Sequence, residues 1–201
     1  EVGIDTVAEL KEKGYNVFAT GEMGIGNTTT SSAVCSVLLD QSVEKVTGKG
    51  AGLTNKDLEH KIEVIKQSIA LNQVDANDPL DVLSKVGGLD IAGMVGCYIG
   101  GAALQVPVFI DGFISSVAAL IAIRLVPECA PYLFPSHCSN EPAGHLILDA
   151  IGKEPYILAN MCLGEGTGAV MGFTIADYAF KAYWELPSFE QTNFGTYEEL
   201  N

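Results

Sequence analysis

Two glutamates lie in glycine-flanked stretches, where a carboxylate has little steric cover from its neighbours. Glu165 lies in LGEGTGA and Glu22 lies in GEMG. Because glycine has no side chain, each carboxylate can face a cavity directly. Two such groups at one site are typical of paired acid–base or proton-holding chemistry. In the alternative interpretation, each one stabilises only the N-terminus of a helix.

A glycine-rich turn, GEMGIGNTTT at 21–30, follows the first predicted strand. Its glycines let backbone amides turn toward a ligand, and the next helix directs its partial positive charge to the same place. This combination suits an anion such as phosphate. The turn matches neither the Walker loop nor GxGxxG, and a tight strand-to-helix turn without a ligand explains the same residues.

Polar residues also lie in the other predicted loops. The turn GKGAG at 48–52 and Lys61 could supply a second amide nest and a point charge, whereas a solvated surface lysine is the alternative. Asp111 and Ser139 come after the next two predicted strands, where a sugar hydroxyl or a phosphate would be met. Either residue could equally be a helix cap.

Histidines and cysteines raise the question of a metal site. His60, His137 and His145 with Cys129 and Cys138 form no CxxC or HxxxH pair, so we expect no metal. We expect His137 to lie in a loop near the pocket and His145 on a helix surface.

The elements that must position these residues alternate between strand and helix, which predicts an α/β fold. Short apolar runs such as ValPheIle at 108–110 are typical of a buried parallel sheet. In such a sheet ligands bind beyond the carboxyl ends of the strands, so the polar loops should meet there. The predicted strands are 15–19, 106–111 and 132–135, and the predicted helices are 4–14, 28–39, 55–72, 78–88, 90–104, 113–124, 141–151 and 167–185.

Length and composition are those of one globular domain. The 201 residues are 48% apolar and 18% charged, and we expect a domain over 1–186 and an acidic, polar tail over 187–201. The formal charge of −14 opposes binding to nucleic acids and to anionic membranes. No cofactor is expected.

Residues 91–110 carry no formal charge, and this stretch is long enough to span a membrane as a helix. Gln105 and Pro107 interrupt the stretch and no flanking Lys or Arg anchors it, so we expect a buried helix that leads into a buried strand. The first residues carry no targeting pattern, and the five cysteines are scattered and odd in number. These features predict a cytoplasmic protein with reduced, buried thiols.

Six ordered blocks of the sequence resemble the motifs of the nicotinate-nucleotide:dimethylbenzimidazole phosphoribosyltransferase family. Together they span nearly the whole chain, which makes chance agreement very improbable. The resemblance implies a three-layer, mostly parallel Rossmann-like sheet flanked by helices, with part of a small helical subdomain. The blocks are ATGEMGIGNTTTSSAV, GKGAGL followed by Lys61, DPLDVLSKVGGLDIAGMVG, VPVFIDGFISSVAAL, PYLFPSHCSNEPAGH and LGEGTGA.

The resemblance also implies a reaction and its site. Phosphoribose would pass from nicotinate mononucleotide to a benzimidazole base, with Glu165 accepting the N–H proton and Glu22 as the second pocket glutamate. A homodimer is implied as well. The residues implied around the mononucleotide are Gly24, Gly26, Asn27, Thr28, Gly50, Lys61, Asp111, Gly112, Ser139, Gly164 and Gly166.

Members of that family are considerably longer, and their N-terminal portion is missing from this chain. We therefore expect an intact mononucleotide half-site, an open benzimidazole half-site and an uncovered apolar surface that drives association or instability. Two alternatives remain: a non-catalytic nucleotide- or anion-binding module, and a truncated chain that acts only with a partner. The natural acceptor base is left open among benzimidazoles, adenine and phenolics.

Overall fold

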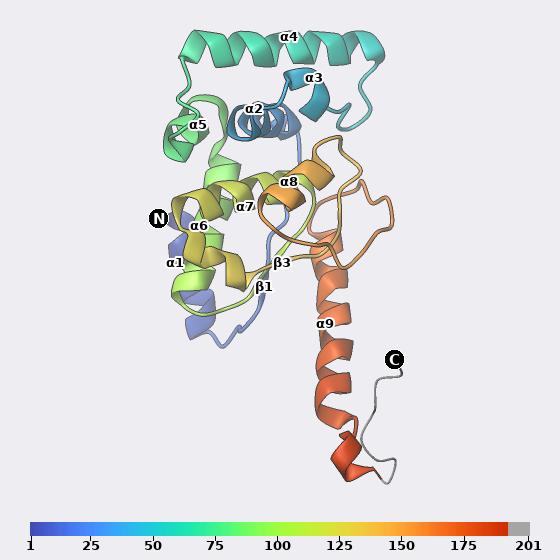
Figure 1. Cartoon of the computed structure of the whole chain (residues 1–201). Helices are drawn as coiled ribbons and strands as arrows, with labels where there is room; N and C mark the ends of the chain where they lie inside the picture. The colour runs from blue at the N-terminus through green and yellow to red at the C-terminus, as the bar shows by residue number, and fades with distance from the viewer. Residues whose placement is uncertain (193–201) are drawn as a thin grey trace, which may run out of the picture.

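The computed structural model describes residues 1–192 and contains a parallel three-stranded sheet (Figure 1). The strands are β1 (Phe18–Ala19), β2 (Val108–Ile110) and β3 (Leu133–Pro135), and they lie side by side in that order. Phe18 pairs with Val108, and Val108 with Leu133. The three predicted strands are confirmed, although β1 is shorter than 15–19 because only its last two residues pair with β2.

Both faces of the sheet are covered, which explains why β2 is continuously apolar. Val108 and Ile110 belong to the main hydrophobic core, whereas Phe109 faces the opposite layer. There its ring meets Phe173 edge to face at 4.9 Å between centroids and stacks on Phe134 at 5.5 Å. The expected three-layer α/β arrangement is therefore present.

The helices agree closely with the predicted periodicity. The predictions for 55–72 and 167–185 are confirmed to the residue, whereas α3, η1 and η2 were not predicted because each spans six residues or fewer. The helices are α1 (Val2–Glu12), α2 (Asn27–Leu39), α3 (Val43–Val46), α4 (Asn55–Asn72), α5 (Pro79–Val86), α6 (Leu89–Ala103), α7 (Phe113–Leu125), α8 (Gly144–Ala150) and α9 (Thr167–Glu185), with 3₁₀ turns η1 (Pro127–Tyr132) and η2 (Phe189–Gln191).

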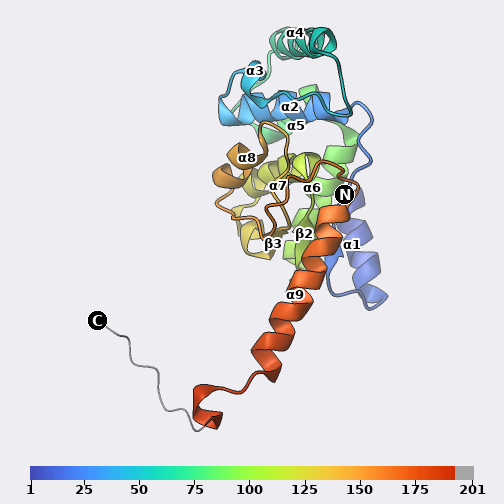
Figure 2. The ribbon, with the colours of Figure 1, turned by 90° about the vertical axis from the view of Figure 1, so that its right-hand side faces the viewer.

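The helices between the strands build the main core on one side of the sheet. Helix α7 lies at its centre and contacts α2, α5, α6 and α8, while α4 packs on the outer side of α2 (Figures 1 and 2). Because α7 is surrounded, almost every residue from Phe113 to Ala122 is buried. A helix that is apolar on all sides belongs in such a central position.

Helix α9 covers the other face only at its beginning. Gly172 lies against the Phe109 ring, where a Cβ would come within 2.8 Å of it. Beyond this point the helix extends away from the body (Figures 1 and 2) and exposes large apolar side chains, among them Phe180, Tyr183 and Trp184. These side chains leave an apolar surface of α9 uncovered.

The uncharged stretch 91–110 forms α6 and β2, as predicted. Within residues 1–192, no helix is both long enough and apolar enough to span a bilayer. The prediction of buried thiols is wrong for Cys162, which is exposed, because it lies on a loop at the cavity rim and not in the core. All five cysteines are free. The predicted tail begins before residue 192, and its residues 193–201 lie outside the described part of the chain.

Helices α1 and α6 pack with their backbones in direct contact, so a side chain added at this contact should destabilise the protein. A Cβ at Gly3 would overlap the carbonyl oxygen of Gly93, so Gly3→Ala must push α1 away from α6. We expect Gly3→Ala to lower the free energy of unfolding by about 1–3 kcal/mol, measured by urea denaturation. The matched control is Gly93→Ala, since a Cβ there meets nothing within 4 Å, and it should be neutral or stabilising by up to about 1 kcal/mol. Equal losses from both substitutions would contradict the packing argument.

Candidate active site

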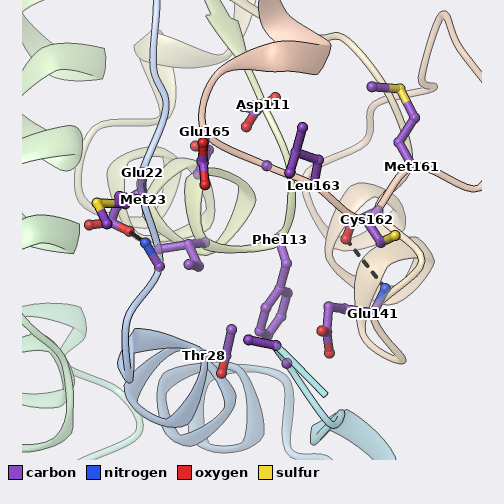
Figure 3. A pocket seen from close by; sticks show the side chains of 18 of the residues that line it. Glu22, Met23, Thr28, Asp111, Phe113, Glu141, Met161, Cys162, Leu163 and Glu165 are labelled. Atoms are coloured by element: carbon purple, nitrogen blue, oxygen red, sulfur yellow. Dashed lines mark hydrogen bonds between the residues drawn. The ribbon is translucent and has the colours of Figure 1, made fainter.

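A cavity of about 320 Å³ opens at the carboxyl ends of the three strands (Figure 3). The loops that follow β1, β2 and β3 line it together with segment 161–165. The prediction that the polar strand-end loops meet at one place is therefore confirmed. The cavity is lined by nine of the predicted residues: Glu22, Gly24, Thr28, Gly50, Asp111, Gly112, Ser139, Gly164 and Glu165.

The other four predicted residues lie immediately behind this lining. Gly26 has a positive φ of 84° at the start of α2, and Asn27 donates a hydrogen bond to Glu22. Lys61 donates to Thr28, and the Gly166 amide donates to Asp111. These residues position the wall of the cavity.

The two glutamate loops touch through their backbones. The Glu165 amide donates a hydrogen bond of 3.3 Å to the Glu22 carbonyl. Gly21 makes this approach possible, because a Cβ there would lie 2.6 Å from the Gly166 nitrogen. The convergence of the two glutamates, expected from the sequence, is a direct consequence of this contact.

Glu165 is held in an unusual backbone conformation. Its φ is 59°, between Gly164 at 73° and Gly166 at 81°. A left-handed conformation at a residue with a Cβ costs about 1–2 kcal/mol, so the surrounding contacts must maintain it. The side chain is exposed toward the cavity, and its carboxylate accepts no hydrogen bond from any residue in 1–192. Glu165 therefore does not cap α9 through a side-chain hydrogen bond, although its charge lies beside the N-terminus of that helix.

Asp111 is the residue that caps α9. Its buried carboxylate accepts hydrogen bonds from the amides of Gly166 at 2.9 Å, Gly168 at 2.9 Å and Ala169 at 3.2 Å. The capping alternative is thus confirmed, although the helix is α9 and not the one that follows Asp111 in sequence. Through these three bonds Asp111 holds the Glu165 loop in place, while it also lines the cavity.

The Glu22 carboxylate also accepts hydrogen bonds from within the protein. Its Oε2 accepts hydrogen bonds from the Gly24 amide and from Asn27 Nδ2, which also lies 2.8 Å from Asp90 Oδ2. The predicted role of the Gly24 amide as a free anion donor is corrected, since the Glu22 carboxylate occupies it. Glu22 thereby stabilises the glycine-rich turn from within.

Lys61 is buried, so its surface alternative is wrong. Its Nζ donates to Thr28 Oγ1 at 2.9 Å and to the Gly48 carbonyl at 3.1 Å. An ammonium has three N–H groups, and these two bonds leave the third without a hydrogen-bonding partner among residues 1–192. Burial lowers the pKa of Lys61, and the negative charge of Glu141 opposes this shift.

His137 lines the cavity and is buried, as predicted for a loop residue near the pocket. Ser136 Oγ donates to the Ile110 carbonyl at 2.7 Å, so it accepts the hydrogen bond of 3.0 Å from His137 Nδ1. This network assigns the proton of the neutral ring to Nδ1 and leaves the Nε2 lone pair as an acceptor. Burial lowers the pKa of His137, and Asp111 at 4.0 Å opposes the shift.

Glu141 was not predicted from the sequence, yet it lines the cavity. It lies six residues beyond the end of β3, so the strand-end argument that selected Ser139 could have found it. Apolar groups complete the lining, among them Phe113, Ile114 and Met161. In the part of the chain that the structure describes, no three metal-binding side chains cluster.

Comparisons with known proteins identify relatives of this chain. A family model described as phosphoribosyltransferase matches residues 1–194. The chain is 52% identical over 200 residues to a nicotinate-nucleotide–dimethylbenzimidazole phosphoribosyltransferase of Ruminiclostridium cellulolyticum, covering 100% of this chain and 57% of that protein. The protein of the same name from Acetivibrio thermocellus is 52% identical over 198 residues, covering 98% and 56%.

A solved structure resembles the fold as well. The crystal structure of CobT from Thermus thermophilus superposes with a TM-score of 0.88 at 31% identity, covering 94% of this chain and 56% of that one. The chain therefore spans little more than half the length of the relatives it matches.

The Asp111 cap leads to a prediction about the Glu165 loop. In Asp111→Asn, an amide nitrogen replaces one acceptor oxygen, and three amides then compete for the other. We expect a loss of about 2–4 kcal/mol in the free energy of unfolding and faster hydrogen exchange at Gly166 and Gly168. Urea denaturation and amide exchange by NMR measure the two effects. Asp149→Asn, at an exposed position on α8, is the matched control, and similar losses from both variants would refute the capping role.

Proposed function

Because the chain belongs to the family of nicotinate-nucleotide–dimethylbenzimidazole phosphoribosyltransferases, we propose that it transfers phosphoribose from nicotinate mononucleotide to 5,6-dimethylbenzimidazole. The products are α-ribazole 5′-phosphate and nicotinate, in the assembly of the cobalamin nucleotide loop. One observation carries the proposal. The Glu165 carboxylate, which accepts no hydrogen bond from residues 1–192, lines the same cavity as Thr28 and Gly50, and Lys61 contacts Thr28 from behind.

The chemistry needs one proton acceptor and no metal. A benzimidazole nitrogen bonds to the anomeric carbon while the bond from that carbon to nicotinate breaks, and its electron pair neutralises the cationic pyridine nitrogen. The azole becomes cationic as it bonds and loses its N–H proton to Glu165. A single displacement from the opposite face converts the β anomer into the α anomer.

Substrate binding must come from local interactions, since a net charge of −14 repels a dianionic mononucleotide at long range. The hydroxyl of Ser139 and the amide of Ala51 can supply donors at one end of the cavity, and the charge of Lys61 lies behind Thr28. Phe113, Ile114 and Met161 offer apolar contacts to a flat base.

Glu165→Gln keeps the shape of the side chain but removes the base. We expect turnover to fall about 10²- to 10⁴-fold with little change in mononucleotide affinity, measured as nicotinate released from nicotinate mononucleotide and dimethylbenzimidazole. Glu154→Gln is the matched control, because Glu154 is exposed and does not line the cavity.

The same assay distinguishes the alternatives. Parent-like turnover of Glu165→Gln excludes Glu165 as the base. Mononucleotide binding without nicotinate release favours a non-catalytic nucleotide- or anion-binding module. Release that appears only when the remaining portion of a longer relative is added favours a chain that acts with a partner.

We also propose that the chain forms a homodimer in the cytoplasm. The five free thiols support a reducing compartment, and the exposed apolar face of α9 supports association. Sedimentation velocity should show dimers whose fraction rises with concentration, and Trp184→Glu should shift them toward monomer. Tyr156→Ser, at an exposed site outside α9, should leave them unchanged. A monomer at all concentrations would refute the dimer.

A further inference from the structure

Glu141 lies where the proposed function requires an anion to bind. Its carboxylate is at the same end of the cavity as Thr28 (Figure 3), and both residues line that cavity with Gly50 and Ser139. Lys61 stands behind this wall, and one of its N–H groups has no hydrogen-bonding partner among residues 1–192. A carboxylate thus shares the subsite that carries the donors for a phosphate.

The carboxylate is poorly satisfied in this position. Its Oε2 is buried and has no hydrogen-bonding partner among the described residues. It packs on Gly48, where any Cβ would overlap it. A buried anionic oxygen without a donor is costly, so this environment makes Glu141 easier to protonate than an exposed carboxylate.

We propose that Glu141 is a proton-linked gate of the anion subsite: it occupies the subsite as a carboxylate and takes up one proton when the phosphate of the mononucleotide binds. The proton comes from solvent and forms the O–H bond of a carboxylic acid. That O–H can donate to a phosphate oxygen, so the group changes from a repelling neighbour to a donor. The identity of the ligand rests on the proposed function.

The charged and titratable neighbours agree with this assignment. Lys61 on α4 attracts the carboxylate, while burial raises the pKa of Glu141 against the opposing effects of Lys61 and the Gly50 amide. From the other elements around the cavity come His137 and Cys162, the carboxylates Glu22, Asp111 and Glu165, and Lys49, which is exposed on the 48–52 turn.

The sign of the pH dependence follows from linkage. If the bound state requires a protonated Glu141, mononucleotide affinity falls as pH rises above the pKa of the free carboxyl. The loss approaches about tenfold per pH unit. Removing the charge with Glu141→Gln abolishes this loss, so the variant should bind more tightly than the parent at high pH and equally at low pH.

The test is calorimetric titration of the 201-residue chain with nicotinate mononucleotide between about pH 5.5 and 8.5, in buffers of different ionisation enthalpy. The parent, Glu141→Gln, Glu141→Asp and the control Glu154→Gln are compared. Since the phosphate titrates identically in all four, differences between the curves report the protein. We expect the ratio of parent to Glu141→Gln dissociation constants to rise from about one to tenfold or more, with net proton uptake in the parent and in Glu141→Asp beyond that of Glu141→Gln. Glu154→Gln should follow the parent.

Two results overturn the proposal alone: parallel curves for parent and Glu141→Gln, or weaker binding by Glu141→Gln at every pH, which would make Glu141 a structural partner of Lys61. If neither protein binds the mononucleotide at any pH while urea denaturation shows both to be folded, the proposed function falls as well.

Discussion

The site depends on one buried carboxylate at the amino end of a helix. Asp111 follows the central strand and accepts three amides of the first turn of α9. This interaction joins the sheet to a segment more than fifty residues away in sequence and compensates for the positive φ of Glu165. Together with the hydrogen bond from the Glu165 amide to the Glu22 carbonyl, it holds the Glu165 loop at the cavity.

Glycines, which have no side chain, allow the loops around the cavity to approach one another closely. Gly21 and Gly166 let the two glutamate loops pass backbone against backbone, and Gly168 leaves room for the His137 ring, which a Cβ would overlap. Glycines at these positions therefore allow close packing between segments, in addition to the conformational freedom that their pattern suggests. As a result, side chains from all three strand ends reach one small volume.

The charge state of each carboxylate in the cavity depends on its immediate hydrogen-bonding partners. Four carboxylates line the cavity, yet two of them, on Glu22 and Asp111, already accept hydrogen bonds from amides. The Glu165 carboxylate accepts no hydrogen bond from residues 1–192, and Glu141 lines the cavity beside Thr28, which Lys61 contacts. The separation of roles among chemically identical groups thus follows from which of them finds donors inside the protein.

The sequence by itself determined the element order, the parallel sheet and the strand-end position of the site, because periodicity and capping are local: α4 and α9 begin and end where the pattern predicts. It also singled out Glu165 and Glu22 through their glycine neighbours. Only the tertiary structure decided that Asp111 caps α9, that Lys61 is buried behind Thr28 and that Glu141 enters the cavity. Each of these depends on which distant segment supplies the hydrogen-bonding partner, and no pattern along the chain encodes that pairing.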